Sequence, residues 1–233
     1  MKHRLFLFDL DDTLLDYQAS EFSSFKHAME KIGFQDDSSA IFSQYQAINF
    51  ALWRSFEAGA ISGDFLKVER FRQTFLKYKL ELDHELASAL YLESFSDTPV
   101  LMDGAKQVCE ALSVIGEVGI ITNGVDIVQN RRIAASGLLD HISFVSTSEA
   151  CGFAKPDVRF LEHTAQMARP FAKNEAILIG DRLEADILGA NRYGIESCWF
   201  NPNLLVNASD ATPTYEIASL HDIIPLLKAR ATA

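Results

Sequence analysis

The stretch Leu5-Phe6-Leu7-Phe8-Asp9-Leu10-Asp11-Asp12-Thr13 decides the fold of this chain. Its first four residues are all apolar, which is typical of a strand buried on both faces of a parallel sheet. The acidic residues that follow then lie at the carboxyl end of that strand. Because ligands of open parallel sheets bind outside this end of the strands, Asp9 and Asp11 are candidate functional residues.

The hydrophobic pattern changes to a helical period after this first strand. Apolar residues recur at intervals of three and four between residues 22 and 56, and again between residues 65 and 95. The stretch from Gly59 to Gly63 and the residue Asp83 separate the predicted helices. We therefore predict a bundle of four helices over residues 17–98, inserted into a core domain made of residues 1–16 and 99–233.

After Pro99, short apolar runs alternate with helical segments, as in βαβ units. We predict strands over 118–122, 142–145, 176–179 and 197–200, and helices over 105–115, 127–136, 157–168, 184–193 and 220–228. Residues 201–213 are rich in Asn, Pro and small residues, which predicts a surface loop. The predicted fold class is α/β, a doubly wound parallel sheet with an inserted helical bundle.

The composition excludes several kinds of partner. The 233 residues include 21 Lys and Arg against 32 Asp and Glu, so the net charge is −11 and attracts neither polymeric nucleic acid nor an anionic membrane surface. No stretch approaches the roughly 20 apolar residues that span a bilayer. The three cysteines are far apart and form no CxxC pair, which fits a reducing compartment. We expect a soluble, cytoplasmic protein, and the sequence leaves its oligomeric state open.

Two carboxylates at the end of the first strand suggest catalysis. Asp9 and Asp11 are two residues apart, so one can act as a nucleophile while the other exchanges a proton. Asp181 and Asp186 follow a later strand and add two carboxylates. Crowded carboxylates repel one another unless protons or a divalent cation relieve them, and ligand sets made only of oxygen favour Mg²⁺.

Three further residues at predicted strand ends complement an anion. Thr122 and Asn123 supply a hydroxyl and backbone amides, and Lys155 supplies a positive charge. Such groups bind the outer oxygens of a phosphoryl group. Together with the carboxylates, they predict phosphoryl transfer on a small phosphomonoester.

The ordered set of clusters resembles the haloacid dehalogenase superfamily of phosphohydrolases. Its four motifs are matched by Phe8–Leu14 (DxDxT), by Ile120–Gly124, by Lys155-Pro156, and by Gly180-Asp181 with Asp186 (GDxxxxD). The helical block between the first two motifs resembles the superfamily's α-helical cap. Two positions depart from the usual pattern: Asp12 stands where many members have Gly, and Arg182 stands where a small polar residue is commoner.

The resemblance implies a role for each matching residue. Asp9 would attack phosphorus and form an aspartyl-phosphate, and Asp11 would protonate the departing alkoxide and then activate the hydrolytic water. Mg²⁺ would be bound by the Asp9 carboxylate, the Asp11 backbone carbonyl and Asp181, with Asp186 acting through a water or just behind these ligands. Thr122, Asn123 and Lys155 would hold the phosphoryl oxygens.

A narrower likeness concerns the substrate. The segments Gln46–Trp53, Gly59–Ile61, Cys198–Asn201 and Pro213–Tyr215 resemble the bacterial pyrimidine 5'-nucleotidase subgroup. That resemblance implies hydrolysis of nucleoside monophosphates such as UMP, dUMP and dTMP. Asn49 and Trp53 are four residues apart and share a helix face, so they could contact a base or simply pack between cap helices.

Three other functions remain open on the residues alone. A phosphatase for sugar phosphates or other small metabolites would use the same chemistry. A dehalogenase is disfavoured, because the dehalogenases that this chain resembles lack the second acid of the pair, here Asp11. A phospho-switch or binding module also combines Asp, Thr and Lys residues, but the large helical insertion argues against it.

Overall fold

The computed structural model describes residues 2–229 and divides them into two compact units. One unit contains the described residues up to 17 and from 100 onward, and the other contains Gln18–Pro99. Within the described residues, the first unit has one six-stranded parallel sheet of order β3-β2-β1-β4-β5-β6. The strands are β1 (Leu5–Phe8), β2 (Glu117–Thr122), β3 (Phe144–Thr147), β4 (Ala176–Gly180), β5 (Glu196–Phe200) and β6 (Tyr215–Ile217).

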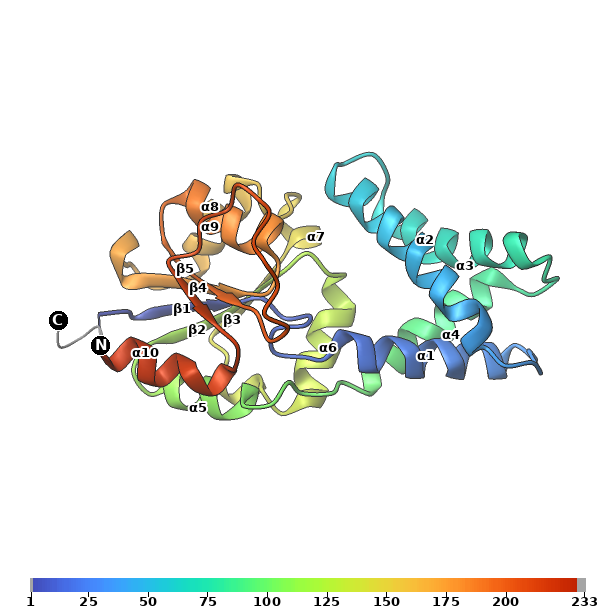
Figure 1. Ribbon diagram of the computed structural model, residues 1–233, viewed down its shortest axis with the longest axis horizontal. Coiled ribbons are helices and arrows are strands. Elements are labelled where there is room, and N and C mark those ends of the chain that lie inside the picture. Colours follow the sequence, from blue (N-terminus) through green and yellow to red (C-terminus); the bar gives the residue numbers. More distant parts are fainter. Residues whose placement is uncertain (1, 230–233) are drawn as a thin grey trace. The chain divides into compact units, whose positions relative to one another are not determined.

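The apolar run at β1 is buried on both faces, as predicted. Phe6 and Phe8 pack into the core beneath helices α5 (Ala105–Ser113), α6 (Asp126–Ser136) and α10 (Ile223–Ala229). Leu5 and Leu7 face the opposite core, which α8 (Val158–Met167) and α9 (Leu188–Tyr193) cover. Figure 1 shows α5 and α10 on one side of the sheet and α8 and α9 on the other. These two layers confirm the doubly wound α/β class.

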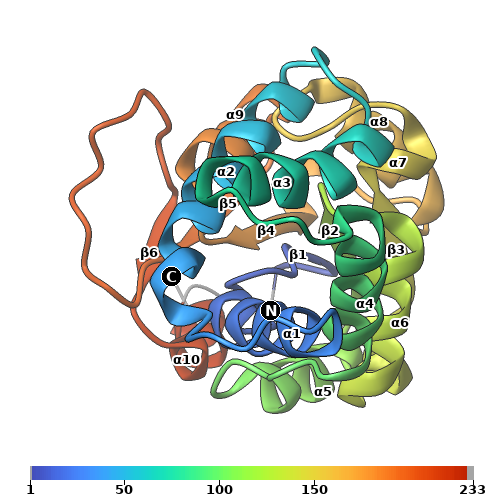
Figure 2. The same ribbon diagram turned by 90° about the vertical axis from the view of Figure 1, so that its right-hand side faces the viewer.

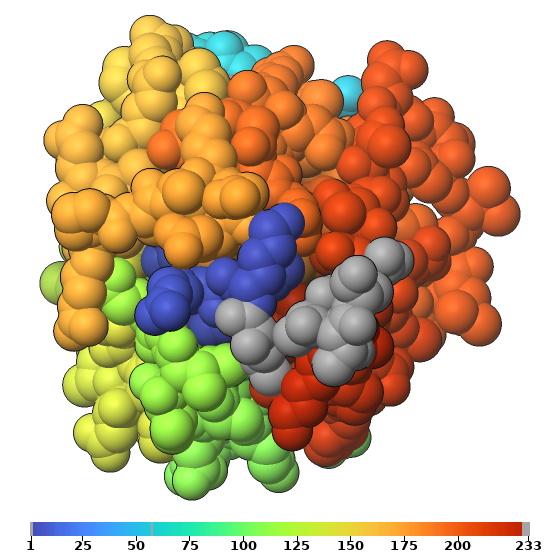
Figure 3. Space-filling model, turned by 90° about the vertical axis from the view of Figure 1, so that its left-hand side faces the viewer, coloured from blue at the N-terminus to red at the C-terminus, as the bar shows by residue number. Residues whose placement is uncertain are grey.

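The central position of β1 sets where the site can form. β1 pairs in parallel with β2 and with β4, so that Phe8 lies level with Ile120 and Ile179. At the amino ends of the strands, Figure 3 shows the first residues of the chain in blue between the green and the orange segments, as these pairings require. At the opposite ends, the residues that follow β1, β2 and β4 come together at one edge of the sheet.

The second unit is a helical bundle of α1 (Tyr17–Lys31), α2 (Ser39–Glu57), α3 (Gly63–Tyr78) and α4 (His84–Asp97). Side-chain oxygens cap two of the helices, because Ser62 accepts from the Phe65 N–H and Asp83 accepts from the Leu86 N–H. Aromatic rings fill the interior, among them Phe25, Tyr45, Phe71 and Tyr91. Figure 2 shows α2 and α3 side by side.

The structure corrects the sequence prediction at two strands. β3 begins at Phe144, two residues later than predicted, because Leu139–His141 forms a 3₁₀ turn and Ile142 packs at the border of the core. β6 was not predicted, since only one of its three residues, Ile217, is buried. The predicted loop before β6 is present and stands away from the sheet in Figure 2. Among the described residues, no helix combines the length and apolar character that crossing a membrane requires.

Candidate active site

A buried lysine lies at the centre of the carboxyl edge of the sheet. The Lys155 Nζ atom donates to Asp9 Oδ1 (2.5 Å), to Asp186 Oδ1 (2.6 Å) and to the Ile121 carbonyl oxygen (3.0 Å). The ammonium therefore uses all three of its hydrogens. Both Lys155 and Asp186 are at most 3% exposed, so these ion pairs are formed inside the protein rather than at its surface.

Negative charge exceeds positive charge around this lysine. Carboxylate oxygens of Asp9, Asp181 and Asp186 lie within 4.8 Å of one another, and Lys155 supplies one positive charge for three carboxyl groups. Burial raises the pKa of Asp9 to about 7, with Asp186 and Asp11 adding to the shift and Lys155 opposing it. Burial and the neighbouring acids also raise the pKa of Asp181 well above its usual range. A hard divalent cation bound by oxygen ligands fits this excess of charge.

Two hydrogen bonds fix Asp181 on the loop after β4. The Thr13 hydroxyl donates to Asp181 Oδ1 (3.1 Å), and the buried Trp199 indole N–H donates to the Asp181 carbonyl oxygen (2.9 Å). The first contact comes from the loop after β1 and the second from β5. Both the carboxylate and the backbone of Asp181 are therefore oriented before any ion binds.

Asp186 reaches Lys155 from a single helical turn, Leu183–Ile187, because Gly180 has no side chain. A Cβ atom at Gly180 would lie 2.5 Å from Asp186 Cγ, a distance that real contacts do not reach. The second oxygen of Asp186 accepts from the Arg182 N–H (3.1 Å). The Arg182 side chain itself is exposed. Glycine before Asp181 is thus a packing requirement of this site.

Asn123 holds the segment that carries Lys155. Its side-chain amide donates to the Lys155 carbonyl oxygen (3.0 Å), and its Oδ1 atom accepts from the Lys155 N–H (2.8 Å). The Ser148 hydroxyl in turn donates to the Asn123 carbonyl oxygen (3.1 Å). The Asn123 side chain therefore positions the Lys155 backbone, and contact of Asn123 with a phosphoryl oxygen stays a prediction.

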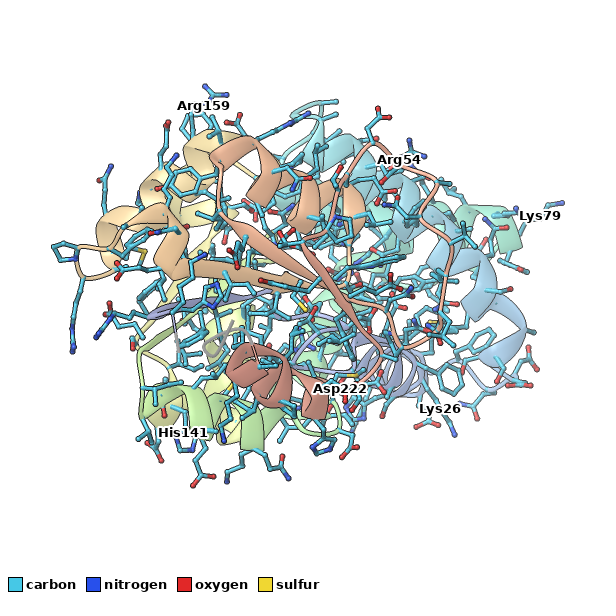
Figure 4. The ribbon with its side chains drawn as sticks, turned by 60° about the vertical axis from the view of Figure 1, so that its left-hand side comes forward. Lys26, Arg54, Lys79, His141, Arg159 and Asp222 are labelled. Carbon is cyan, nitrogen blue, oxygen red and sulfur yellow. The ribbon has the colours of Figure 1, made fainter. Side chains whose placement is uncertain are left out.

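Asp11 has two partners on helix α6 that none of the sequence motifs indicates. Its Oδ2 atom accepts from Gln129 Nε2 (2.6 Å), and its Oδ1 atom forms an ion pair with Arg132. Charged side chains such as Arg159 point outward in Figure 4, whereas Arg132 is fully buried. The one signal in the sequence is that Gln129 and Arg132 are three apart on a predicted helix and therefore share a face.

The unusual Asp12 is explained by its backbone. Its φ angle is +57°, in the left-handed region that favours glycine and that Asp tolerates better than most residues. Its Oδ1 atom accepts from the Tyr17 N–H (3.0 Å). Asp12 therefore takes the backbone conformation of a glycine and adds a contact that glycine lacks.

The two candidate substrate contacts lie in the helical unit. Asn49 is buried, donates to Glu21 Oε1 (2.9 Å) and accepts from Arg70 (3.3 Å). Trp53 is half-buried and packs edge-on against Phe56. The Asn49 amide thus belongs to a polar network inside the bundle, and contact of either residue with a base stays a prediction.

A doubly wound parallel sheet with buried carboxylates, a lysine and a threonine hydroxyl at its carboxyl edge indicates an α/β enzyme. More specifically, the chain belongs to the haloacid dehalogenase-like hydrolases, whose family model matches residues 3–194. The protein is thus a hydrolase, and the family resemblance read from its motifs is confirmed.

Similar proteins cover almost the whole chain. The putative HAD-hydrolase YfnB of Bacillus subtilis is 34% identical over 99% of this chain and 98% of its own length. The pyrimidine 5'-nucleotidase PynA of Streptococcus pneumoniae is 34% identical over 97% of this chain and 96% of its own. The pyrimidine 5'-nucleotidase YjjG of Escherichia coli is 27% identical over 97% and 99%, respectively.

Solved structures share this fold. The crystal structure of YfnB bound to magnesium has a TM-score of 0.89 at 32% identity and covers 97% of this chain and 99% of that one. The L-2-haloacid dehalogenase of Xanthobacter autotrophicus has a TM-score of 0.78 at 15% identity, covering 97% and 98%. The second likeness shows the common fold alone.

The raised pKa values predict a Mg²⁺ effect on stability that depends on pH. A carboxyl group whose pKa is higher in the folded state stabilises the fold below its unfolded pKa of 3.8, and this stability is lost as pH rises through about 7 for Asp9. A bound cation would offset that loss. We therefore expect saturating Mg²⁺ to raise the melting temperature by about 5–10 °C at pH 8 and by much less at pH 5.

Thermal melts of chelator-treated protein, with and without Mg²⁺, check this expectation. The Asp181→Asn variant is the matched control, because it removes one candidate ligand charge and should lose most of the pH 8 increment. An increment of equal size at both pH values, or one that Asp181→Asn retains, would contradict the assignment of the cation to these carboxylates.

Proposed function

We propose that the protein is a Mg²⁺-dependent phosphomonoesterase that hydrolyses pyrimidine nucleoside 5'-monophosphates, and that residues 17–98 form its cap. The observation that carries the chemistry is the Asp9 carboxylate, held 2.5 Å from Lys155 Nζ beside Asp181 and Asp186, with Asp11 two residues further along. The nucleotide preference is supported by the two relatives named pyrimidine 5'-nucleotidases.

In the first half of this reaction, an Asp9 oxygen forms a bond to phosphorus as the bond from phosphorus to the nucleoside 5'-oxygen breaks. Before the substrate binds, Asp11 is a carboxylate paired with Arg132. It would take a proton from solvent as the negatively charged substrate enters and give that proton to the departing oxygen, so the nucleoside leaves as a neutral alcohol. Lys155 balances charge beside Asp9, and the Thr122 hydroxyl donates to a phosphoryl oxygen.

In the second half, a water oxygen attacks phosphorus and the Asp11 carboxylate takes its proton. The bond from phosphorus to Asp9 breaks, which returns Asp9 as a carboxylate and releases inorganic phosphate. Asp9, Asp181 and the Asp11 backbone carbonyl would hold Mg²⁺, with Asp186 behind them. The ion would supply positive charge that draws nucleophile and phosphoryl oxygens together.

The substrate preference is tested by phosphate release from a panel of monophosphates. We expect kcat/KM for dUMP, UMP or dTMP to exceed that for AMP or GMP at least tenfold, and a chelator to abolish all turnover. Asp140 is exposed, so Asp140→Asn serves as a control variant whose rates should be unchanged. Equal rates on purine and pyrimidine nucleotides would contradict the preference, and turnover in excess chelator would contradict the metal.

A sugar-phosphate substrate is the second candidate, and a specific relative favours it. The ribulose-1,5-bisphosphate 5-phosphatase of Halopiger xanaduensis is 32% identical over 91% of this chain. The same panel should therefore contain pentose and triose phosphates. Higher kcat/KM on these than on any nucleotide would replace the nucleotide assignment while keeping the chemistry.

A further inference from the structure

We propose that Gln129 and Arg132, on helix α6, are positioning residues that orient the Asp11 carboxylate and the Thr122 hydroxyl as one unit. This inference rests on the proposed function, because it gives the two residues a task in phosphomonoester hydrolysis. It concerns the described residues of the α/β unit alone.

Arg132 is built into the interior with Asp11 as its ion partner. Its guanidinium is fully buried, and one nitrogen, Nη1, bonds both to Asp11 Oδ1 and to Gln129 Oε1, the latter at 2.9 Å. A buried guanidinium keeps its positive charge at any working pH, so it needs a carboxylate nearby. Asp11 itself is only partly buried, so this contact holds a side chain that could otherwise rotate.

The arginine fixes which way the Gln129 amide faces. An arginine can only donate hydrogen bonds, so the atom beside it must be the amide oxygen. The amide nitrogen therefore faces Asp11 and Thr122. It donates one hydrogen to Asp11 Oδ2 (2.6 Å) and the other to Thr122 Oγ1 (3.0 Å). Gln129 therefore ties the carboxylate that exchanges protons to the hydroxyl that binds phosphate.

This arrangement determines what the Thr122 hydroxyl can do. Its oxygen accepts from Gln129 Nε2 and from the Gly124 N–H, both at 3.0 Å. A hydroxyl oxygen has two lone pairs, so both are occupied and its hydrogen is left to donate. Thr122 is thus prepared to donate to an anionic oxygen before a phosphoryl group arrives.

Two local features make the contact possible. A Cβ atom at Gly124 would lie 2.2 Å from Gln129 Nε2, so glycine at this position gives the amide room. The start of α6 is anchored to the neighbouring segment, because the Thr147 hydroxyl donates to Asp126 Oδ1 (2.7 Å) and the Asp126 N–H donates to Glu149 (2.8 Å). These contacts fix the first turn of α6 and thereby the positions from which Gln129 and Arg132 reach Asp11.

The dependence of rate on the leaving group separates positioning from a general structural role. p-Nitrophenolate leaves without needing a proton, whereas a nucleoside alkoxide needs one from Asp11. We expect Arg132→Met to lower kcat for dUMP about 100-fold, which is the size of a general acid's contribution. With p-nitrophenyl phosphate as substrate, the initial burst of p-nitrophenolate should slow less than about threefold in the same variant. Arg132→Lys should recover part of the dUMP rate, and Arg131→Met, an exposed neighbour on α6, should match wild type.

Gln129→Glu tests the second half of the inference with nearly the same shape. A glutamate cannot donate to Thr122, so the hydroxyl turns its hydrogen toward the new carboxylate and away from phosphate. We expect the inhibition constant of inorganic phosphate to rise about tenfold or more. Exposed Asn130→Asp is the matched control for the added charge.

Several results would overturn the proposal. In Arg132→Met, equal losses in dUMP turnover and in the burst rate of p-nitrophenolate would show a structural role only, and unchanged rates would show no role. If Arg132→Met fails to fold by thermal melts, Arg132→Lys and Gln129→Glu decide the question in the same assays. A wild-type protein that turns over no phosphomonoester overturns the proposed function as well, whereas an active wild type with unaffected variants overturns the positioning role alone.

Discussion

Replacing Asp9 by asparagine is expected to lower phosphate release at least about 10⁴-fold while the protein stays folded. The amide cannot form the bond to phosphorus, and loss of a nucleophile removes most of an enzyme's rate enhancement. Asp9→Asn keeps the shape of the side chain and leaves Lys155 paired with Asp186 (2.6 Å). It also removes one of three crowded carboxyl groups, so without Mg²⁺ the melting temperature should be equal or higher.

Single-turnover assays on wild type, Asp9→Asn and the exposed control Asp140→Asn check this expectation. Burst release of p-nitrophenolate should be present in wild type and the control and absent from Asp9→Asn. An Asp9→Asn protein that is folded by its melting curve and retains a tenth of the wild-type rate would exclude Asp9 as the nucleophile.

The strands that carry the site could be predicted because burial leaves a strong trace in sequence. Leu5–Phe8 has apolar side chains at every position, and this happens where both faces of a strand are covered. β6 has no such apolar run, because only one of its three residues is buried and a single buried residue does not form a hydrophobic pattern. The register then placed Asp9 beside the residues that follow β2 and β4.

The partners of Asp11 could not be predicted from the sequence. Gln129 and Arg132 lie 118 and 121 positions further along the chain, and their contact depends on how α6 is rotated about its axis. A buried Arg132 looks the same in sequence as exposed Arg131 beside it. The same difficulty applies to Asn123, whose bonds to the Lys155 backbone follow from two loops meeting in space.

In the helical unit, too, the positions of the helices could be predicted from the sequence but the contacts between their side chains could not. The spacing of its apolar residues predicted four helices, and the structure has α1 to α4 in those places. The periodicity did not show that Glu21, Asn49 and Arg70 would be buried together as a hydrogen-bonded group. Buried polar groups need hydrogen-bond partners, which here come from other helices, and the sequence of one helix does not show which residues of the others those are.

Replacing Lys155 by methionine is expected to destabilise the metal-free protein by about 3–5 kcal/mol at pH 7 and to abolish turnover. Burial opposes a charged lysine, but Asp186 and Asp9 raise the pKa of Lys155 above its usual range, so the group is an ammonium when the protein is folded. Methionine fills the space without the charge. Asp9 and Asp186 would then face each other inside the protein with no cation between them.

Urea unfolding of wild type, Lys155→Met and the double variant Lys155→Met/Asp186→Asn separates charge from packing. If lost charge is the cause, removing the second carboxylate should recover part of the free energy of unfolding, and saturating Mg²⁺ should stabilise Lys155→Met more than wild type. Exposed Lys106→Met on α5 controls for the substitution itself and should change stability by less than about 0.5 kcal/mol. A Lys155→Met cost below about 1 kcal/mol, or no recovery in the double variant, would mean that Lys155 does not compensate these carboxylates.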